Sequence, residues 1–168
     1  MHKIGKKLGK RCLLILFVIA AAFILNRYVA GRVTVDGDSM EPVLHDGERI
    51  WVDKISFRFK EPERYDIVVF RYRYRKDRYY IKRIVGLPGE TVQIIDGSVY
   101  VDGERLGEDY GAEPIEKAKR ADQPVVLGKD EYFVLGDNRN HSTDSRDSDV
   151  ANVAKEQITG KVIEWQGR

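Results

Sequence analysis

The sequence predicts a mainly β domain, an antiparallel sheet folded over into a barrel or sandwich, preceded by one N-terminal transmembrane helix. From residue 33 onward, short runs rich in β-branched and aromatic residues recur, and glycine, proline or charged clusters separate them. At the N-terminus, basic residues precede an unbroken apolar run. Many short strands with little helix are typical of folded-over barrels and sandwiches.

The N-terminal segment divides into a basic part, residues 1–11, and an apolar part, residues 12–30. Residues 12–25 are all apolar, and continuing to Ala30 gives about nineteen residues, close to the ~20 that span a bilayer. Positive charge before such a run keeps the N-terminus in the cytoplasm. The sequence therefore predicts a single-pass anchor in the cell membrane, with residues 31–168 forming an extracytoplasmic domain.

A cleavable signal peptide is the alternative interpretation, because Ala20, Ala21 and Ala22 supply an A-x-A-like cleavage site. Cutting there would leave only residues 13–19 as the apolar region, at the short limit. Cutting after Ala30 would place Tyr28 where a small residue is required. We therefore favour an uncleaved anchor, and either interpretation places the folded domain outside the cytoplasm.

Length and composition exclude several classes of site. A chain of 168 residues is most simply one domain with an appendage. A formal charge of +2, with much of the basic excess in the first eleven residues, predicts no nucleic-acid partner. Cys12 is the only cysteine, which excludes an intrachain disulfide. The scattered histidines and aspartates show no ligand spacing, so we expect no metal and no cofactor.

The strands are expected in order along the domain. After a β-branched run at 33–35, strands are predicted at 49–52, 66–70 and 79–81. The clearest hairpin joins 91–95 to 98–101 through Asp96 and Gly97, a pair that favours a two-residue type I′ turn. Asp102 and Gly103 predict a further reversal of the chain.

The C-terminal third begins with a polar stretch, residues 107–123, which predicts a variable loop insertion or a short helix. Residues 131–135 form an expected strand that leads into a second special turn, and residues 158–165 fit a closing strand. Trp51, Phe57 and Phe59 are interspersed with basic residues. They predict either partial core or a face that rests on the bilayer with the help of anionic lipid.

Ser39 lies on a shaped, non-helical turn. Gly37 permits backbone angles that a Cβ would forbid, and Pro42 fixes its own φ. Such a turn can present a nucleophile with backbone N–H groups facing one oxygen. The residues alone also fit an ordinary polar turn, because these residue types dominate turns.

A serine nucleophile needs a neighbouring base, and the sequence offers two. A Ser-His-Asp set would use Ser39, His141 and Asp144. The other base is Lys82, which strand alternation places on one face with Tyr80 and Ile84. Burial would lower the pKa of this lysine and yield a neutral amine near pH 7. A surface lysine on an edge strand remains the structural alternative.

A third cluster, residues 136–146, is dense in short polar side chains. Asp144 and Arg146 could form a charge-assisted pair that fixes the loop. Ser142 could orient a neutral lysine amine, as a carboxylate orients histidine in a triad. An Asx-rich turn network accounts for the same residues.

Taken together, these stretches resemble the bacterial type I signal peptidases, a family of membrane-anchored Ser-Lys endopeptidases. Residues 39–42 match the nucleophile box, 64–70 a box usually written R-G-D-I-V-V-F, and 82–90 the lysine box. Residues 136–146 match G-D-N-R-x-x-S-x-D-S-R in full. The resemblance implies a protease that removes signal peptides from exported preproteins at the outer face of the cytoplasmic membrane.

The resemblance also implies a role for each matched residue. Ser39 would attack the scissile carbonyl, and Lys82 would serve as general base and then as general acid to the leaving amine. Ser142 would orient Lys82, and Asp144 and Arg146 would form a supporting ion pair.

The resemblance further implies how substrate and oxyanion are held. The Ser39 backbone N–H would supply one oxyanion contact. Gly37 stands where some members carry a hydroxyl, so backbone or water would replace that donor. Pockets for small residues before the cut would be lined near Val35, Asp36, Met40, Leu44, Tyr80 and Ile81.

Two other functions compete with this interpretation. A related Ser-Lys self-cleaving repressor would require a DNA-binding helix pair before the serine, and the sequence has a membrane anchor there instead. A catalytically silent, membrane-tethered β domain that binds exported proteins would not need both Ser39 and Lys82.

Overall fold

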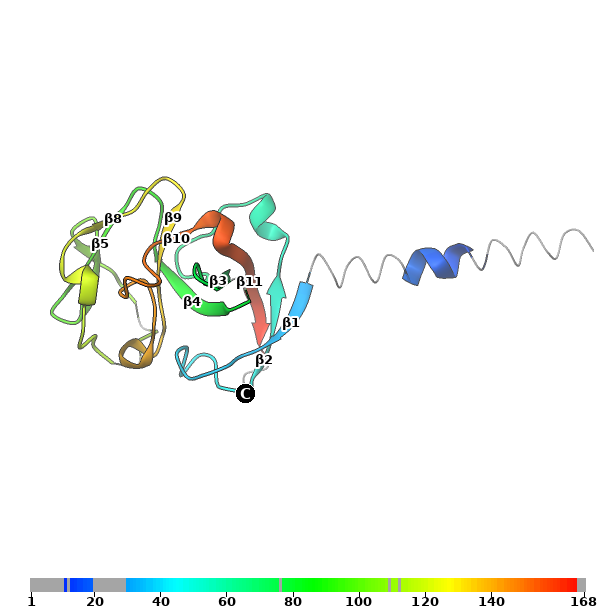
Figure 1. Ribbon diagram of the computed structural model, residues 1–168, viewed down its shortest axis with the longest axis horizontal. Helices are drawn as coiled ribbons and strands as arrows, with labels where there is room; N and C mark the ends of the chain where they lie inside the picture. The colour runs from blue at the N-terminus through cyan, green and yellow to red at the C-terminus, as the bar shows by residue number, and fades with distance from the viewer. Residues whose placement is uncertain are drawn as a thin grey trace, which may run out of the picture.

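The structure, a computed structural model, describes residues 11, 13–19, 30–75, 77–108, 110–111 and 113–165. Two antiparallel sheets form the domain (Figure 1). The larger sheet curls around the middle of the molecule, and the smaller sheet lies at the end opposite β1 (Figure 1). The predicted mainly β fold with a folded-over antiparallel sheet is confirmed.

The larger sheet has seven strands in the order β1-β2-β11-β3-β4-β9-β10. The C-terminal strand β11 pairs with β2 on one side and β3 on the other. Their bounds are β1 Ala30–Thr34, β2 Arg49–Asp53, β3 Ile67–Arg71, β4 Tyr79–Gly86, β9 Glu131–Leu135, β10 Val153–Ala154 and β11 Ile158–Trp165.

The smaller sheet has four strands in the order β7-β6-β5-β8. Asp96 and Gly97 both have positive φ, 47° and 78°, as the predicted type I′ turn requires. Asp102 and Gly103 repeat this, and the predicted further reversal is confirmed. The bounds are β5 Thr91–Ile95, β6 Ser98–Val101, β7 Glu104–Arg105 and β8 Val125–Val126.

Short 3-10 helices connect the strands. In the stretch predicted as a loop insertion, 107–123, the described residues form no strand, and η3 lies near its end. The bounds are η2 Ser56–Arg58, η3 Lys119–Asp122, η4 Arg139–His141 and η5 Lys155–Gln157.

Three apolar clusters hold the sheets. One lies between the sheets and includes Val85, Val92 and Phe133. A second includes Met40 and Leu44 from the turn after β1, which ties that turn to β2 and β3. A third contains the remaining buried apolar residues of β3 and β4. The turn that carries Ser39 is therefore anchored by buried residues that follow the serine directly.

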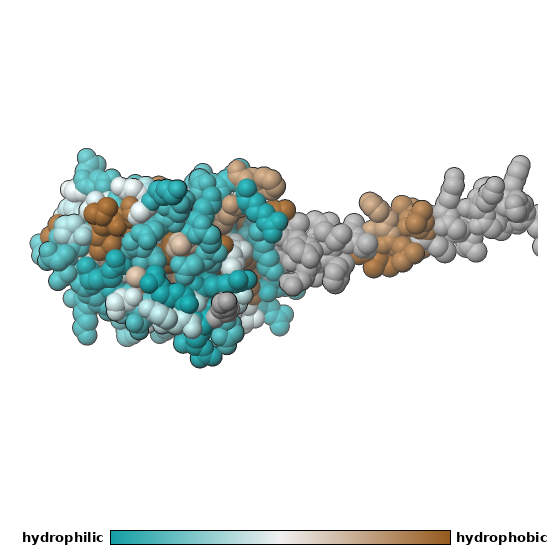
Figure 2. Space-filling view, turned by 45° about the horizontal axis from the view of Figure 1, so that its top comes forward, coloured by the Kyte–Doolittle hydropathy of each residue, from teal (hydrophilic) through white to brown (hydrophobic). Residues whose placement is uncertain are grey.

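The predicted transmembrane segment, 12–30, lies mostly outside the described residues. Of it, residues 13–19 are helical and exposed, and Ala30 begins β1. The apolar side chains of residues 13–19 appear in brown in Figure 2, whereas the visible face of the domain is largely hydrophilic. Among the residues described, no helix has both the length and the apolarity to cross a membrane.

Candidate active site

The turn after β1 holds Ser39 through a series of local hydrogen bonds. Gly37 has a φ of 93°, a conformation that side chains disfavour. The Glu41 N–H donates to the Asp38 carbonyl at 3.0 Å, and the Leu44 N–H donates to the Met40 carbonyl at 2.9 Å. Because Met40 and Leu44 are buried, the turn cannot shift without disturbing the core.

Lys82, on β4, reaches Ser39 directly. Its Nζ lies 2.7 Å from the Ser39 Oγ and donates to the Ile81 carbonyl at 2.9 Å. Nζ also lies 5.6 Å from the centroid of the Tyr80 ring, so these side chains share a face as strand alternation predicts. Lys82 is 3% exposed. The structure therefore does not fit the alternative of a surface lysine on an edge strand.

Burial lowers the pKa of the Lys82 amine from its usual 10.5 to about 8, because the charged ammonium loses its hydration. The carboxylates of Asp144 and Asp137 act in the opposite direction and favour the ammonium, while Arg146 disfavours it. The neutral amine is therefore a substantial species at mildly alkaline pH, in hydrogen-bond contact with a serine hydroxyl.

Asp144 and Arg146 form a buried, bidentate pair. Arg146 Nε donates to Asp144 Oδ1 and Nη2 donates to Oδ2, both at 2.8 Å. The Gly136 N–H also donates to Asp144 Oδ2 at 3.1 Å, and Arg146 Nη2 donates to the Arg139 carbonyl. The pair therefore fixes both ends of the loop that follows β9.

Gly136 packs against the turn that carries Ser39. A Cβ at this position would come within 2.3 Å of the Ser142 Oγ and 2.4 Å of the Ser39 carbonyl oxygen. The Ser142 Oγ is buried and has no hydrogen-bond partner among the described residues. Ser142 therefore lies beside the Ser39 backbone, with its hydroxyl available to a nearby donor or acceptor.

Replacing Gly136 with alanine is expected to destabilise the fold by about 1–3 kcal/mol, because the added methyl would collide with both the Ser142 side chain and the Ser39 backbone. Chemical denaturation measures the change. Gly107→Ala is the matched control: nothing lies within 4 Å of its Cβ position, so its effect should stay within about 0.5 kcal/mol. Equal stability of the two variants would contradict the close packing at Gly136.

Several supporting contacts could not be read from the sequence. The Asn138 N–H donates to the Ser39 carbonyl and its side-chain amide to the Asp38 carbonyl, both at 3.2 Å. Arg83, next to Lys82, pairs bidentately with buried Asp137 at 2.8 and 2.7 Å. Alternation places Arg83 on the face opposite Lys82, but it shows neither that this face is buried nor that Asp137 is the partner. No local pattern in the sequence points to the contacts of Asn138.

The N–H of Gly37 donates to the Asp46 carboxylate at 2.8 Å, so it is engaged within the turn. For the Ser39 N–H, no acceptor is found in the described part of the chain. Of these two expected oxyanion donors, only the Ser39 N–H is therefore free of a protein acceptor.

A cleft of about 280 Å³ opens at Ser39 and Lys82. Five of the six residues expected to bind substrate line it: Val35, Asp36, Met40, Tyr80 and Ile81. The sixth, Leu44, is fully buried behind the turn with Met40 and does not line the cleft.

The alternative Ser-His-Asp set is not assembled. His141 has an exposed side chain at the end of η4. The Asp144 carboxylate is buried and is used by Arg146 and the Gly136 N–H. Of the two candidate bases, the structure brings only Lys82 to Ser39.

Comparison with known proteins identifies the family of the chain. The family model described as signal peptidase, peptidase S26, matches residues 8–165. The chain is 37% identical over 153 residues to a signal peptidase I of Bacillus amyloliquefaciens, covering 87% of this chain and 80% of that protein. It is 36% identical over 154 residues to signal peptidase I S of Bacillus subtilis (strain 168), covering 87% and 82%.

A solved structure is also similar. The crystal structure of a signal peptidase I from Enterococcus faecalis V583 superposes with a TM-score of 0.52 at 31% identity, covering 62% of this chain and 98% of that one. The family model spans most of the sequence, and the curated relatives match over most of their own length. The chain therefore belongs to the signal peptidase family, peptidase S26, and within it to the type I signal peptidases.

Proposed function

We propose that this protein is a serine endopeptidase that removes N-terminal signal peptides from exported preproteins, with Ser39 as nucleophile and Lys82 as general base. The observation that carries the proposal is the buried Lys82 amine 2.7 Å from the Ser39 hydroxyl. A lysine with a lowered pKa is the kind of base that activates a serine without histidine.

The reaction would proceed in two halves. Neutral Lys82 takes the proton of the Ser39 hydroxyl as Oγ attacks the scissile carbonyl carbon. The resulting Lys82 ammonium gives that proton to the leaving amine as the peptide bond breaks, which leaves an acyl-enzyme and a neutral amine. Water then repeats the sequence: Lys82 removes its proton, the hydroxide oxygen bonds to the acyl carbon, and Ser39 leaves with the proton returned.

Positioning residues would support this chemistry. Ser142 would hydrogen-bond to Lys82 and orient its amine, for which its buried hydroxyl is suited, since it has no hydrogen-bond partner in the described part of the chain. The Asp144–Arg146 pair would hold the loop that carries Ser142. Neither metal nor cofactor is required by any step.

The Ser39 N–H would contact the oxyanion that develops on the substrate. Because the Gly37 N–H is engaged by Asp46, its contribution would require that hydrogen bond to be exchanged for one to the substrate. A missing oxyanion donor costs ~10²-fold in rate where nothing replaces it.

Substrate would bind in the cleft as an extended strand, between the segment before Ser39 and β4. Val35, Met40, Tyr80 and Ile81 line this cleft, and the pockets that they form would select small side chains by excluding large ones. Leu44 would support the pocket indirectly, by packing against Met40.

Residues 12–30 would anchor the protein in the cytoplasmic membrane, with residues 1–11 in the cytoplasm and 31–168 outside. Membrane lipid would then be a partner as well as the preprotein. The basic residues before the apolar run support this orientation.

Replacing Ser39 with alanine is expected to abolish cleavage, because it removes the hydroxyl that lies 2.7 Å from the Lys82 amine and faces the cleft. Processing of a preprotein by the detergent-solubilised full chain, with the product N-terminus read by mass spectrometry, measures the effect. Unchanged processing would exclude the proposed enzyme and favour a membrane-tethered binding domain.

The pH dependence should follow Lys82. Only the neutral amine accepts a proton, and its fraction rises with pH until the pKa of about 8 is passed. We therefore expect kcat/KM to rise about tenfold per pH unit on the acidic side and to level off above about pH 8. A flat profile with chemistry rate-limiting would contradict the role of Lys82.

A further inference from the structure

A second hollow adjoins the substrate cleft and shares Val33, Val69 and Tyr79 with it. Its volume is about 450 Å³. Val33, Val52 and Val69 give it an apolar lining, and three cations, Lys54, Arg58 and Arg71, contribute to the same lining. We call it the cationic hollow.

The charge of the cationic hollow is not balanced. Its lining includes no carboxylate, and Lys54, Arg58 and Arg71 have no ion-pair partner among the described residues. Lys54 also lies against β1, because a Cβ at Gly31 would come within 2.6 Å of the Lys54 Nζ. Gly31 thus leaves room for the amine beside the start of the domain.

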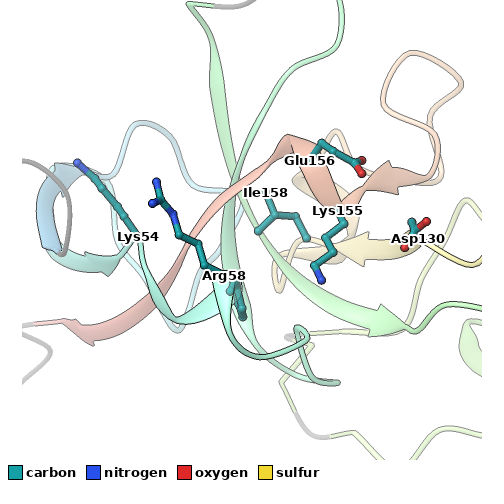
Figure 3. A pocket seen from close by; sticks show the side chains of 7 residues that line it. Lys54, Arg58, Asp130, Lys155, Glu156 and Ile158 are labelled. Carbon is teal, nitrogen blue, oxygen red and sulfur yellow. The ribbon is translucent and has the colours of Figure 1, made fainter.

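A neighbouring pocket of about 530 Å³ provides a contrast. Lys54 and Arg58 border it as well, but the ends of both side chains point the same way, away from Lys155 (Figure 3). That pocket also carries Asp130 and Glu156, so its charges are mixed. The cationic hollow is the one that favours an anion.

An apolar lining with three cations fits an amphiphile rather than a small anion alone. Phosphate oxygens accept charge-assisted hydrogen bonds from lysine and arginine, and arginine can bind them bidentately. The three valines offer contact to methylene groups beside the phosphate. The hollow is too small for a whole phospholipid, so the acyl chains would have to stay in a bilayer.

The place of the hollow in the chain indicates where that bilayer would be. Gly31 and Val33 belong to β1, which begins at Ala30, the last residue of the predicted membrane segment 12–30. If residues 12–30 anchor the protein, the hollow lies at the point where the chain enters the domain. Phosphate groups of the outer leaflet would then be close to it.

We infer that the cationic hollow binds the phosphate of an anionic phospholipid, with Lys54, Arg58 and Arg71 on the phosphate and the valines on the adjoining methylenes. The inference rests on the proposed membrane anchor but not on the proposed cleavage reaction. Bound lipid would fix the domain so that the cleft, which shares Tyr79 with the hollow, opens at the membrane surface.

The test is native mass spectrometry of the full chain in mild detergent, titrated with phosphatidylglycerol or phosphatidylcholine. We expect tighter binding of phosphatidylglycerol, and a loss of about tenfold or more in its affinity in Lys54→Gln/Arg58→Gln. The control Arg105→Gln/Lys129→Gln removes the same charge from exposed positions outside the hollow, and should change the affinity less than twofold.

Three outcomes would overturn the inference. Equal losses in both double variants would indicate non-specific charge attraction. Inorganic phosphate that displaces phosphatidylglycerol at equal concentration would indicate a free-phosphate site. A lowered kcat/KM of Lys54→Gln/Arg58→Gln on a soluble peptide in lipid-free detergent would make the hollow an extension of the substrate cleft. Loss of cleavage with Ser39→Ala bears on the enzyme alone and leaves this test unaffected.

Discussion

Replacing Lys82 with alanine is expected to lower preprotein cleavage by about 10²- to 10⁴-fold, the range that general-base catalysis typically contributes. The reason is geometric: Lys82 Nζ hydrogen-bonds to the Ser39 Oγ, and no other base contacts this oxygen among the described residues. The measurement is single-turnover cleavage by the detergent-solubilised full chain. Lys82→Met is a useful second variant, because it fills the same buried space without an amine.

His141→Ala is the matched control. The side chain of His141 is exposed and Asp144 is occupied by Arg146, so its removal should change the rate less than twofold. Survival of activity with His141→Ala and loss with both Lys82 variants, all folded, would establish the Ser-Lys dyad. The opposite pattern would make this a histidine-dependent hydrolase.

Replacing Asp144 with alanine is expected to destabilise the fold by about 3–5 kcal/mol, because it leaves Arg146 buried without its counter-ion. Arg146 is 2% exposed, so solvent cannot take the place of the carboxylate. Denaturation by urea, followed by tryptophan fluorescence, measures the loss. Cleavage should fall as well, since the Gly136 N–H loses its acceptor and the loop beside Ser39 loosens.

Two controls separate this effect from the loss of an ordinary contact. Asp144→Ala/Arg146→Met should cost less than the two single variants together, because neither charge remains unpaired. Arg75→Ala breaks the exposed Arg75–Asp77 pair and should change stability by less than about 1 kcal/mol. A similar small loss with Asp144→Ala would contradict a structural role for the buried pair.

Local patterns in the sequence were sufficient to predict the positions of most strands. Two Asp-Gly pairs predicted turns with positive φ at both positions, and both are found. Alternation along β4 predicted that Lys82 and Tyr80 share a face, and the Lys82 amine does lie over the Tyr80 ring. These features depend on neighbours in the chain, which is why the sequence alone determines them.

Contacts between distant segments were not predictable in the same way. The Asn138 side-chain amide donates a hydrogen bond to the Asp38 carbonyl, 100 residues earlier in the sequence. Arg139 forms an ion pair with Glu108, which lies in the stretch expected to be a variable loop. Which residues become contact partners depends on how the two sheets curl, and no local sequence pattern determines that arrangement. The expectation that Leu44 lines a pocket has the same limit, because the sequence shows that Leu44 is apolar but not which side of the turn it faces.

The position of β11 has a consequence for biosynthesis. Ser39 follows β1, which pairs with β2, whereas Lys82 lies on β4, which pairs with β3. Between these two halves of the sheet lies β11, the last strand in chain order among the described residues. A nascent chain that has not yet delivered Ile158–Trp165 carries both residues but lacks the strand that joins their halves. Assembly of the proposed Ser39–Lys82 site would therefore follow the synthesis of β11, well after both of its residues have been made.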